Sequence, residues 1–229
     1  MPERITIVCL ANSRKHSGRC VAGIAVDSDG RPQEWVRPVS DRPGSEVSEL
    51  DRKYKNGTDP KVLDVISVPL VRASPRDFQT ENWLLEPSEY WVKTGEIGWG
   101  DLDDFLSPPQ HLWPGMSPST YNGSHDRLTL EEAEIFDHSL LFIKVDDLLI
   151  RVFAPGAMFG EPKRRVQTRF THRGRIYWVW TTDPVIEREF LSRPDGEYRV
   201  GVSYLTVSLG EPHEGFCYKM VAAVIRSNL

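Results

Sequence analysis

Two apolar segments near the N-terminus, residues 5–11 and 20–26, constrain the fold of this chain most strongly. They are apolar at consecutive rather than alternating positions, which is typical of strands that are buried on both faces or closed into a barrel. A polar, basic loop over residues 12–19 joins them, and residues 35–39 predict a further short strand. The pattern predicts a strand–loop–strand unit that presents arginines and hydroxyl groups from a rigid support.

Length and composition favour a soluble globular protein. The chain has 229 residues, of which 39% are hydrophobic and 27% charged, enough for one large or two small domains. No apolar run approaches the roughly 20 residues that span a bilayer, and the N-terminus lacks the apolar core of a signal peptide. Cys9, Cys20 and Cys217 lack metal-site spacing and are expected to be buried, reduced thiols. We therefore expect a cytoplasmic protein without membrane contact.

Charge and turn signals divide the chain into two halves. Residues 1–138 hold 15 Lys and Arg against 23 Asp and Glu, whereas residues 139–229 hold 13 against 10. The first half contains a Gly-, Pro- and Ser-rich stretch over residues 95–127, expected either to be functional or to pack over the core through Trp99 and Trp113. We predict one domain over residues 1–138 and a second over residues 139–229.

The second half has the pattern of a small barrel or sandwich. Short predicted strands flank two turn signals, Asp146-Asp147 and Arg173-Gly174. Asp183 followed by Pro184 predicts the start of a helix that reaches about residue 191. A capping-box spacing at Thr129 predicts another short helix just before this half. The expected fold class is all-β with a few short helices.

Several segments resemble a known family. They are residues 9–15 (CLANSRK) with 18–23 (GRCVAG), 35–40 (WVRPVS), 79–82 (QTEN), 204–212 (YLTVSLGEP) and 218–225 (YKMVAAVI). With these segments the chain resembles the prokaryotic dual OB-containing domain (DuOB) family. The resemblance implies two tandem OB-like β-barrels and a connection to nucleic acids or nucleotides, and it implies no particular reaction.

A basic strand pair in the second half predicts a nucleic-acid-binding surface. A basic face beside aromatic rings is typical of proteins that hold single strands, because charge follows the backbone while rings stack on bases. The alternative is an ordinary solvated strand face without a ligand. We expect the rings of Trp178 and Trp180 to lie in the barrel core. The candidate contacts here are Lys163, Arg164, Arg165, Arg169, Arg173, Arg175 and Tyr177.

The opening loop offers a second set of candidate contacts. Arg14, Lys15 and Arg19 can hold a phosphate, together with neighbouring hydroxyl and amide groups. Equally, Asn12 and Ser13 can satisfy local backbone groups while Arg14 pairs with a carboxylate. Arg37 is a weaker candidate, since an arginine on a short strand is more often part of a structural ion pair.

The sequence contains no complete catalytic set, phosphate-binding glycine motif or metal-ligand spacing. We therefore expect no catalytic residue, metal or cofactor, although the residues do not exclude an enzyme. The leading hypothesis is a non-catalytic module that binds single-stranded DNA or RNA or a nucleotide and serves as the recognition component of a larger prokaryotic system. The alternatives are a protein-interaction adaptor that uses the acidic first half, and a nucleotide- or nucleic-acid-processing enzyme with an ion at residues 101–104.

Overall fold

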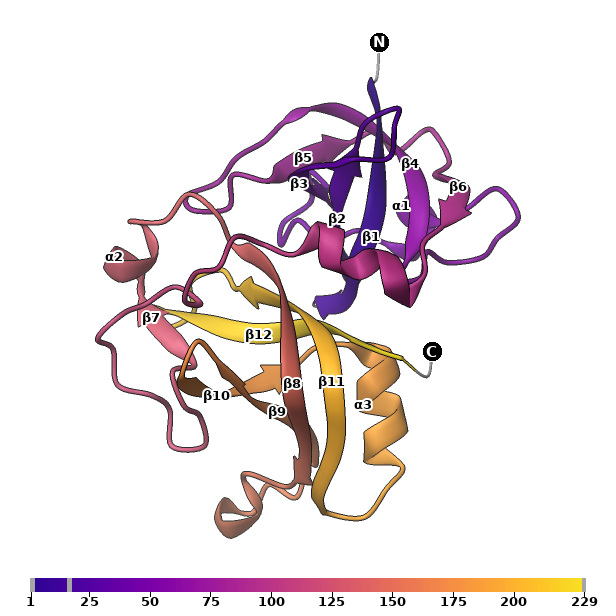
Figure 1. Ribbon diagram of the computed structural model, residues 1–229. Helices are drawn as coiled ribbons and strands as arrows, with labels where there is room; N and C mark the ends of the chain where they lie inside the picture. The colour runs from indigo at the N-terminus through magenta and orange to yellow at the C-terminus, as the bar shows by residue number, and fades with distance from the viewer. Residues whose placement is uncertain (1–2, 16–17, 228–229) are drawn as a thin grey trace. The chain divides into compact units, whose positions relative to one another are not determined.

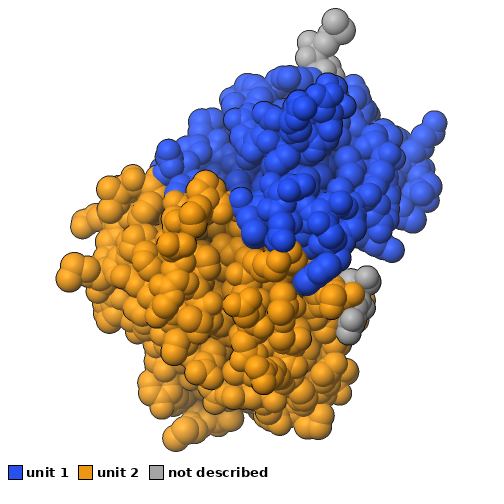
Figure 2. All heavy atoms as spheres, viewed as in Figure 1, with its two compact units in different colours: residues 1–106, 137–140 blue, residues 107–136, 141–229 orange. Residues whose placement is uncertain are grey.

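The protein folds into two compact units, each built from two stretches of sequence (Figure 2). The computed structural model describes residues 3–15 and 18–227. Unit 1 comprises residues 1–106 and 137–140, and unit 2 comprises residues 107–136 and 141–229. The expected all-β class with a few short helices is confirmed. The sequence-based division at residue 138 placed residues 107–136 in the first domain, whereas they group with unit 2.

Unit 1 contains a closed, five-stranded barrel (Figure 1). Its strands follow the order β1-β2-β3-β5-β4 and close through a β1–β4 pairing. Neighbouring strands are antiparallel except β3 and β5, which are parallel. The elements are β1 (Glu3–Lys15), β2 (Gly18–Val26), β3 (Pro32–Val39), α1 (Glu49–Arg52), β4 (Asp64–Ala73), β5 (Asn82–Leu85), β6 (Val92–Glu96) and the 3-10 helix η1 (Trp99–Phe105).

The barrel closes because β1 is long enough to pair on both edges. Its residues Ile7 and Val8 are paired with β2 and with β4 at the same time. Gly23 of β2 lies so close to β1 that an added Cβ would stand 2.2 Å from the Val8 carbonyl oxygen, so this position requires glycine. Both faces of β1 and β2 are buried around these residues, as the consecutive apolar pattern predicts.

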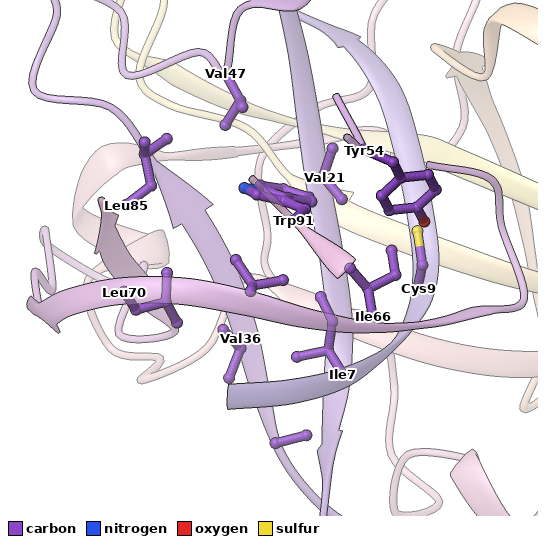
Figure 3. Packing of buried hydrophobic residues seen from close by; sticks show 12 residues of the cluster. Ile7, Cys9, Val21, Val36, Val47, Tyr54, Ile66, Leu70, Leu85 and Trp91 are labelled. Carbon is purple, nitrogen blue, oxygen red and sulfur yellow. The ribbon is translucent and has the colours of Figure 1, made fainter. Parts of the chain in front are cut away.

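The core of unit 1 is apolar, with one polar pair at its side. Ile7, Val21, Val36 and Trp91 are fully buried within it (Figure 3). The Tyr54 hydroxyl donates a hydrogen bond of 2.8 Å to the buried carboxylate of Asp64. Burial raises the pKa of the neighbouring Cys9 thiol to about 12, so Cys9 is an inert core residue.

Unit 2 contains a second closed barrel, with the strand order β8-β9-β10-β12-β11 and a further β8–β11 pairing. Here β10 and β12 are the parallel pair, and they close the ring. The elements are β7 (Arg127–Thr129), α2 (Leu130–Ala133), β8 (Leu140–Phe153), the 3-10 helix η2 (Ala157–Phe159), β9 (Arg165–His172), β10 (Arg175–Thr181), α3 (Pro184–Leu191), β11 (Gly196–Leu209) and β12 (Phe216–Arg226).

Both barrels have the same connectivity. In each, the first strand neighbours the second and fourth, the third neighbours the fifth in parallel, and a helix stands between the third and fourth strands. Five strands in a Greek-key barrel are the hallmark of the OB-fold. The expected pair of tandem OB-like barrels is confirmed, although the sequence shows no internal repeat.

Residues 107–136 belong to unit 2 because their hydrogen bonds go there. Ser124 exchanges backbone hydrogen bonds of 3.2 and 3.1 Å with Trp178 of β10. The short strand β7 pairs with β12. Trp113 is fully buried, so it cannot be presented to a partner. The segment is thus packed against the barrel, which was one of the two roles expected for it.

One predicted turn and the predicted helix cap are confirmed, and the other predicted turn is wrong. Arg173 and Gly174 both have positive φ, 50° and 77°, as a two-residue hairpin turn requires. Asp183 accepts hydrogen bonds from the backbone of Val185 and Ile186 and starts α3 as predicted. The hairpin turn predicted at Asp146-Asp147 is wrong, because both residues lie within the continuous strand β8. Within the described residues, no helix is long and apolar enough to cross a membrane.

Candidate nucleic-acid interface

The outer face of β8, β9 and β10 carries arginines interleaved with aromatic rings. Arg169 lies opposite Leu149 on one side and Trp178 on the other, and residues two positions along each strand share this face. The inward-facing neighbours Ile150, Phe170 and Val179 are buried. We call the outward cluster the arginine–aromatic platform; it consists of Arg151, Phe153, Arg165, Arg169, Trp178 and Trp180.

Cation–π contacts join these side chains to one another. The guanidinium carbon of Arg151 lies 4.0 Å from the Phe153 ring centroid and 5.6 Å from that of Trp178. Arg169 lies 5.3 Å from Trp178. The rings of Phe153 and Trp180 are nearly parallel, with centroids 5.9 Å apart. Guanidinium groups stack on aromatic faces because they are flat and weakly hydrated, so the rings hold these arginines in place on the strand face.

The two ends of the platform differ in charge. At the end near the β8–β9 loop, Lys163 and Arg165 are exposed, and Met158 and Phe159 are 91% and 83% exposed. At the opposite end, a pocket of about 370 Å³ includes Asp146, Asp147, Arg169 and Arg173 among its lining residues. The loop end is therefore the more favourable one for phosphate.

The structure distributes the predicted basic residues unevenly. Lys163, Arg165 and Arg173 are exposed, Arg169 is partly exposed, and Arg175 is partly buried at the start of β10. Arg164 is engaged elsewhere: its Nε lies 2.6 Å from Asp195, and its Nη1 donates to the Leu191 carbonyl, 2.9 Å away. Arg164 therefore holds the C-terminal end of α3, where an arginine favourably satisfies free carbonyls.

Tyr177 is the predicted contact that the structure removes from the surface. It is 1% exposed and stacks on Phe170, with centroids 5.5 Å apart, so it cannot stack on a base. Lys219 lies 5.7 Å from the same ring and is also buried. Burial lowers the pKa of Lys219 to about 8, against the opposing attraction of Asp126.

The expected core position of Trp178 and Trp180 is also wrong. Both rings are partly exposed on the platform, because the strand pleat places Tyr177 and Val179 inside. Arg151 and Phe153 of β8 were missed altogether. The alternation of Leu149, Arg151 and Phe153 carried the signal, but the sequence did not show that this strand pairs with β9.

The opening loop forms the β1–β2 hairpin of unit 1. Arg14 lies opposite Arg19 and is exposed; Lys15 is partly buried, and residues 16–17 lie outside the described residues. The Asn12 amide donates to the Pro60 carbonyl, 2.7 Å away, and the Ser13 hydroxyl to the Cys20 carbonyl, 3.4 Å away. Ser13 thus satisfies a backbone group of the same hairpin, whereas Asn12 satisfies one 48 residues away, and the phosphate-binding role of Arg14, Lys15 and Arg19 stays a prediction.

Arg37 lies inside unit 1, where a bound nucleic acid cannot reach it. It is 4% exposed and forms an ion pair with Glu81, and both side chains contact the Ser139 hydroxyl. Arg37 therefore belongs to a buried ion pair, the alternative that the sequence favoured.

The corresponding outer face of unit 1 has a different character. Its β1 and β2 carry Val8, Leu10, Ala22 and Ile24 there, all of them buried. The two barrels thus share a topology but differ in the side chains on the outer face of their first and second strands. Within the described residues, only unit 2 exposes an arginine–aromatic face on these strands.

The acidic residues 101–104 do not gather into a metal site. Asp101 accepts a hydrogen bond of 2.8 Å from the Gly98 backbone at the start of η1. Among residues 3–15 and 18–227, no group of three or more His, Cys, Asp or Glu side chains can hold a metal ion.

Comparison with known proteins agrees with the topology. The family model described as the dual OB-containing domain matches residues 5–224, nearly the whole chain. Neither a curated protein nor a solved structure matches the chain. A match over both barrels, together with their shared OB-type strand order, shows that the chain belongs to the dual OB-containing domain (DuOB) family.

Proposed function

We propose that unit 2 binds single-stranded nucleic acid, or a nucleotide with the same chemistry, on the arginine–aromatic platform. The observation that carries this proposal is the interleaving of three arginines with three aromatic rings on the outer face of β8–β10. Strand faces of OB barrels are common sites for oligonucleotides, and stacking with cationic contacts is how single strands are held without base reading. The protein would serve as a non-catalytic recognition module.

The loop end of the platform supports a direction for the bound strand. Lys163, Arg165 and the exposed ring of Phe159 stand where β8 turns into β9, whereas two aspartates line the pocket at the other end. Phosphates are attracted more strongly to the first end, because at the second end Asp146 and Asp147 offset the charges of Arg169 and Arg173. We infer that the best-held nucleotide lies beside Phe153 and Arg165.

Titration with labelled single strands of about ten nucleotides at several salt concentrations tests the proposal. If Lys163, Arg151, Arg165 and Arg169 each neutralise a phosphate, log K falls against log salt with a slope of roughly −3 for a single strand. Absence of binding at low salt would contradict the proposal. A slope near zero would replace it with a binding mode that depends on stacking alone.

The expected cytoplasmic location belongs to this proposal. All three cysteines are free, as expected of a reducing compartment. Fractionation of cells that express the chain from its own gene checks it.

A further inference from the structure

Unit 1 has a pocket that the proposed function does not use. Its volume is about 320 Å³, within the range of small-molecule sites. Trp35 of β3 and Trp83 of β5 contribute two indole rings to its lining. The remaining lining residues are Glu34, Ala73, Thr80, Glu81, His138 and Leu140, all of them within unit 1.

The charge of the lining selects the kind of ligand. Two glutamates line the pocket, of which Glu34 is exposed and Glu81 is paired with the buried Arg37, and no lysine or arginine is among the described residues that line it. The unit as a whole is acidic, with 14 Lys and Arg against 19 Asp and Glu in residues 1–106 and 137–140. A phosphate-bearing ligand would be repelled here, whereas a cation with N–H donors would be attracted.

Glu81 is held in place before any ligand arrives. One of its carboxylate oxygens accepts hydrogen bonds from Arg37 and from the Ser139 hydroxyl. Its second oxygen is buried and has no hydrogen-bond partner within the described part of the chain. An unpaired buried acceptor is unfavourable, so a donor that reaches it would gain more than a donor meeting a hydrated carboxylate.

The indole rings of Trp35 and Trp83 favour one class of cation over another. A guanidinium is flat, stacks on indole faces and presents a fork of N–H donors to a carboxylate, whereas an ammonium is a compact and strongly hydrated point charge. The indole rings and the carboxylate acceptors of this pocket together fit a guanidinium better than an ammonium. We propose that this pocket binds a guanidinium group, carried by a small molecule or by an arginine side chain of a protein partner. Trp35 and Trp83 would contact its faces, and Glu34 and Glu81 its N–H edges.

NMR of the full chain with ¹⁵N-labelled indoles tests the proposal with methylguanidinium as the probe. Spectra of Trp35→Phe and Trp83→Phe assign the two indole signals. We expect both signals to shift in a saturable way, with a Kd on the order of 1 mM, which is reasonable for a ligand of so few atoms. Methylurea, which has nearly the same shape and no charge, should leave them unmoved. A capped Gly-Arg-Gly peptide that binds more tightly than methylguanidinium would identify a protein arginine as the natural source, and weaker binding would identify a free small molecule.

Matched variants separate the site from general electrostatics. Glu34→Gln removes a lining carboxylate and should weaken methylguanidinium binding about threefold, the size of a solvent-accessible ion pair. Glu96→Gln removes an exposed charge outside the pocket and should change nothing. Glu81 is left intact, because its loss would strand the buried Arg37. The proposal would be overturned if methylurea shifted the two indole signals as much as methylguanidinium does, or if propylammonium bound more tightly. It would also be overturned if guanosine shifted the two signals and methylguanidinium did not. The result does not depend on nucleic-acid binding by unit 2.

Discussion

The guanidinium carbon of Arg165 lies 4.0 Å from the centroid of the Trp180 ring. The contact joins a residue at the start of β9 to one near the end of β10, and it holds a long, flexible side chain against a flat surface. A cation placed in advance loses less conformational entropy when a phosphate binds. The relationship therefore explains how a chain with a net charge of −5 can offer a localised cationic site.

Replacing platform arginines should weaken binding in a salt-dependent manner. Arg165→Gln and Arg169→Gln should each lower affinity for a single strand at low salt and reduce the salt slope by about 0.7, the share of one phosphate contact. Affinity measured by fluorescence anisotropy at several salt concentrations checks this. Arg31→Gln, which removes an exposed arginine from unit 1, is the control. An unchanged slope in both platform variants would rule out their contact with phosphate.

The two neighbouring aromatic residues of β10 should behave in opposite ways. Trp178→Ala should leave folding largely intact and cost about 1–3 kcal/mol of binding free energy, the value of a stacked base. Tyr177→Ala should cost about 3–5 kcal/mol of unfolding free energy, because it empties a packed core position. Urea unfolding and strand titration of both variants separate the effects. Tyr121→Ala, at a 93% exposed ring outside the platform, controls for the loss of any surface aromatic.

Stability should fall when one partner of the buried ion pair is replaced and should largely recover when both are replaced. Arg37→Met leaves Glu81 as an uncompensated buried charge and should destabilise the protein by about 3–5 kcal/mol. Arg37→Met combined with Glu81→Leu should restore much of that loss. Denaturant midpoints at constant m-value provide the measurement. If the single variant is as stable as the original chain, the pair is not buried as described.

Lys219 should make stability rise with pH in a narrow window. Its pKa in the folded protein is about 8, below the ordinary value near 10.5, because burial disfavours the charged form. Between these values the unfolded chain binds more protons, so the free energy of unfolding increases with pH, by at most about 3 kcal/mol. Unfolding measured at pH 8 and pH 9.5 should show part of this increase. Lys219→Met should abolish it, and an equal rise in that variant would assign the effect to other groups.

Much of the fold is readable from the sequence because it depends on local chemistry. The consecutive apolar runs of β1 and β2 follow from burial on both faces, and the Arg173-Gly174 turn and the Asp183 cap follow from backbone requirements at single residues. Asp146-Asp147 misled because strong turn formers can also occur within a long strand, at a point where both of its faces are exposed. The place of residues 107–136 depends on distant partners such as Trp178, and no local pattern encodes it.

The sequence predicted the positive charge of the candidate site but not which aromatic and β8 residues belong to it. The basic character of residues 163–175 pointed to the correct strands. Which aromatic residues face outward depends on the phase of the pleat in β10, and the sequence favoured Trp178 and Trp180 inside and Tyr177 as a contact, the reverse of what the structure has. Arg151 and Phe153 join the platform only through the pairing of β8 with β9, a contact between residues 12 to 20 positions apart such as Arg151 and Gln167.

The alternation of the two units along the chain has a consequence for anyone who wishes to study them apart. Ser139, which contacts both Arg37 and Glu81 in unit 1, is encoded after the segment that contributes β7 to unit 2. A fragment that ends at residue 106 therefore lacks a partner of the buried ion pair, and one that starts at residue 141 lacks β7 and Trp113. No single cut of the gene yields two complete units, and during synthesis unit 1 lacks residues 137–140 until the ribosome has passed residue 140.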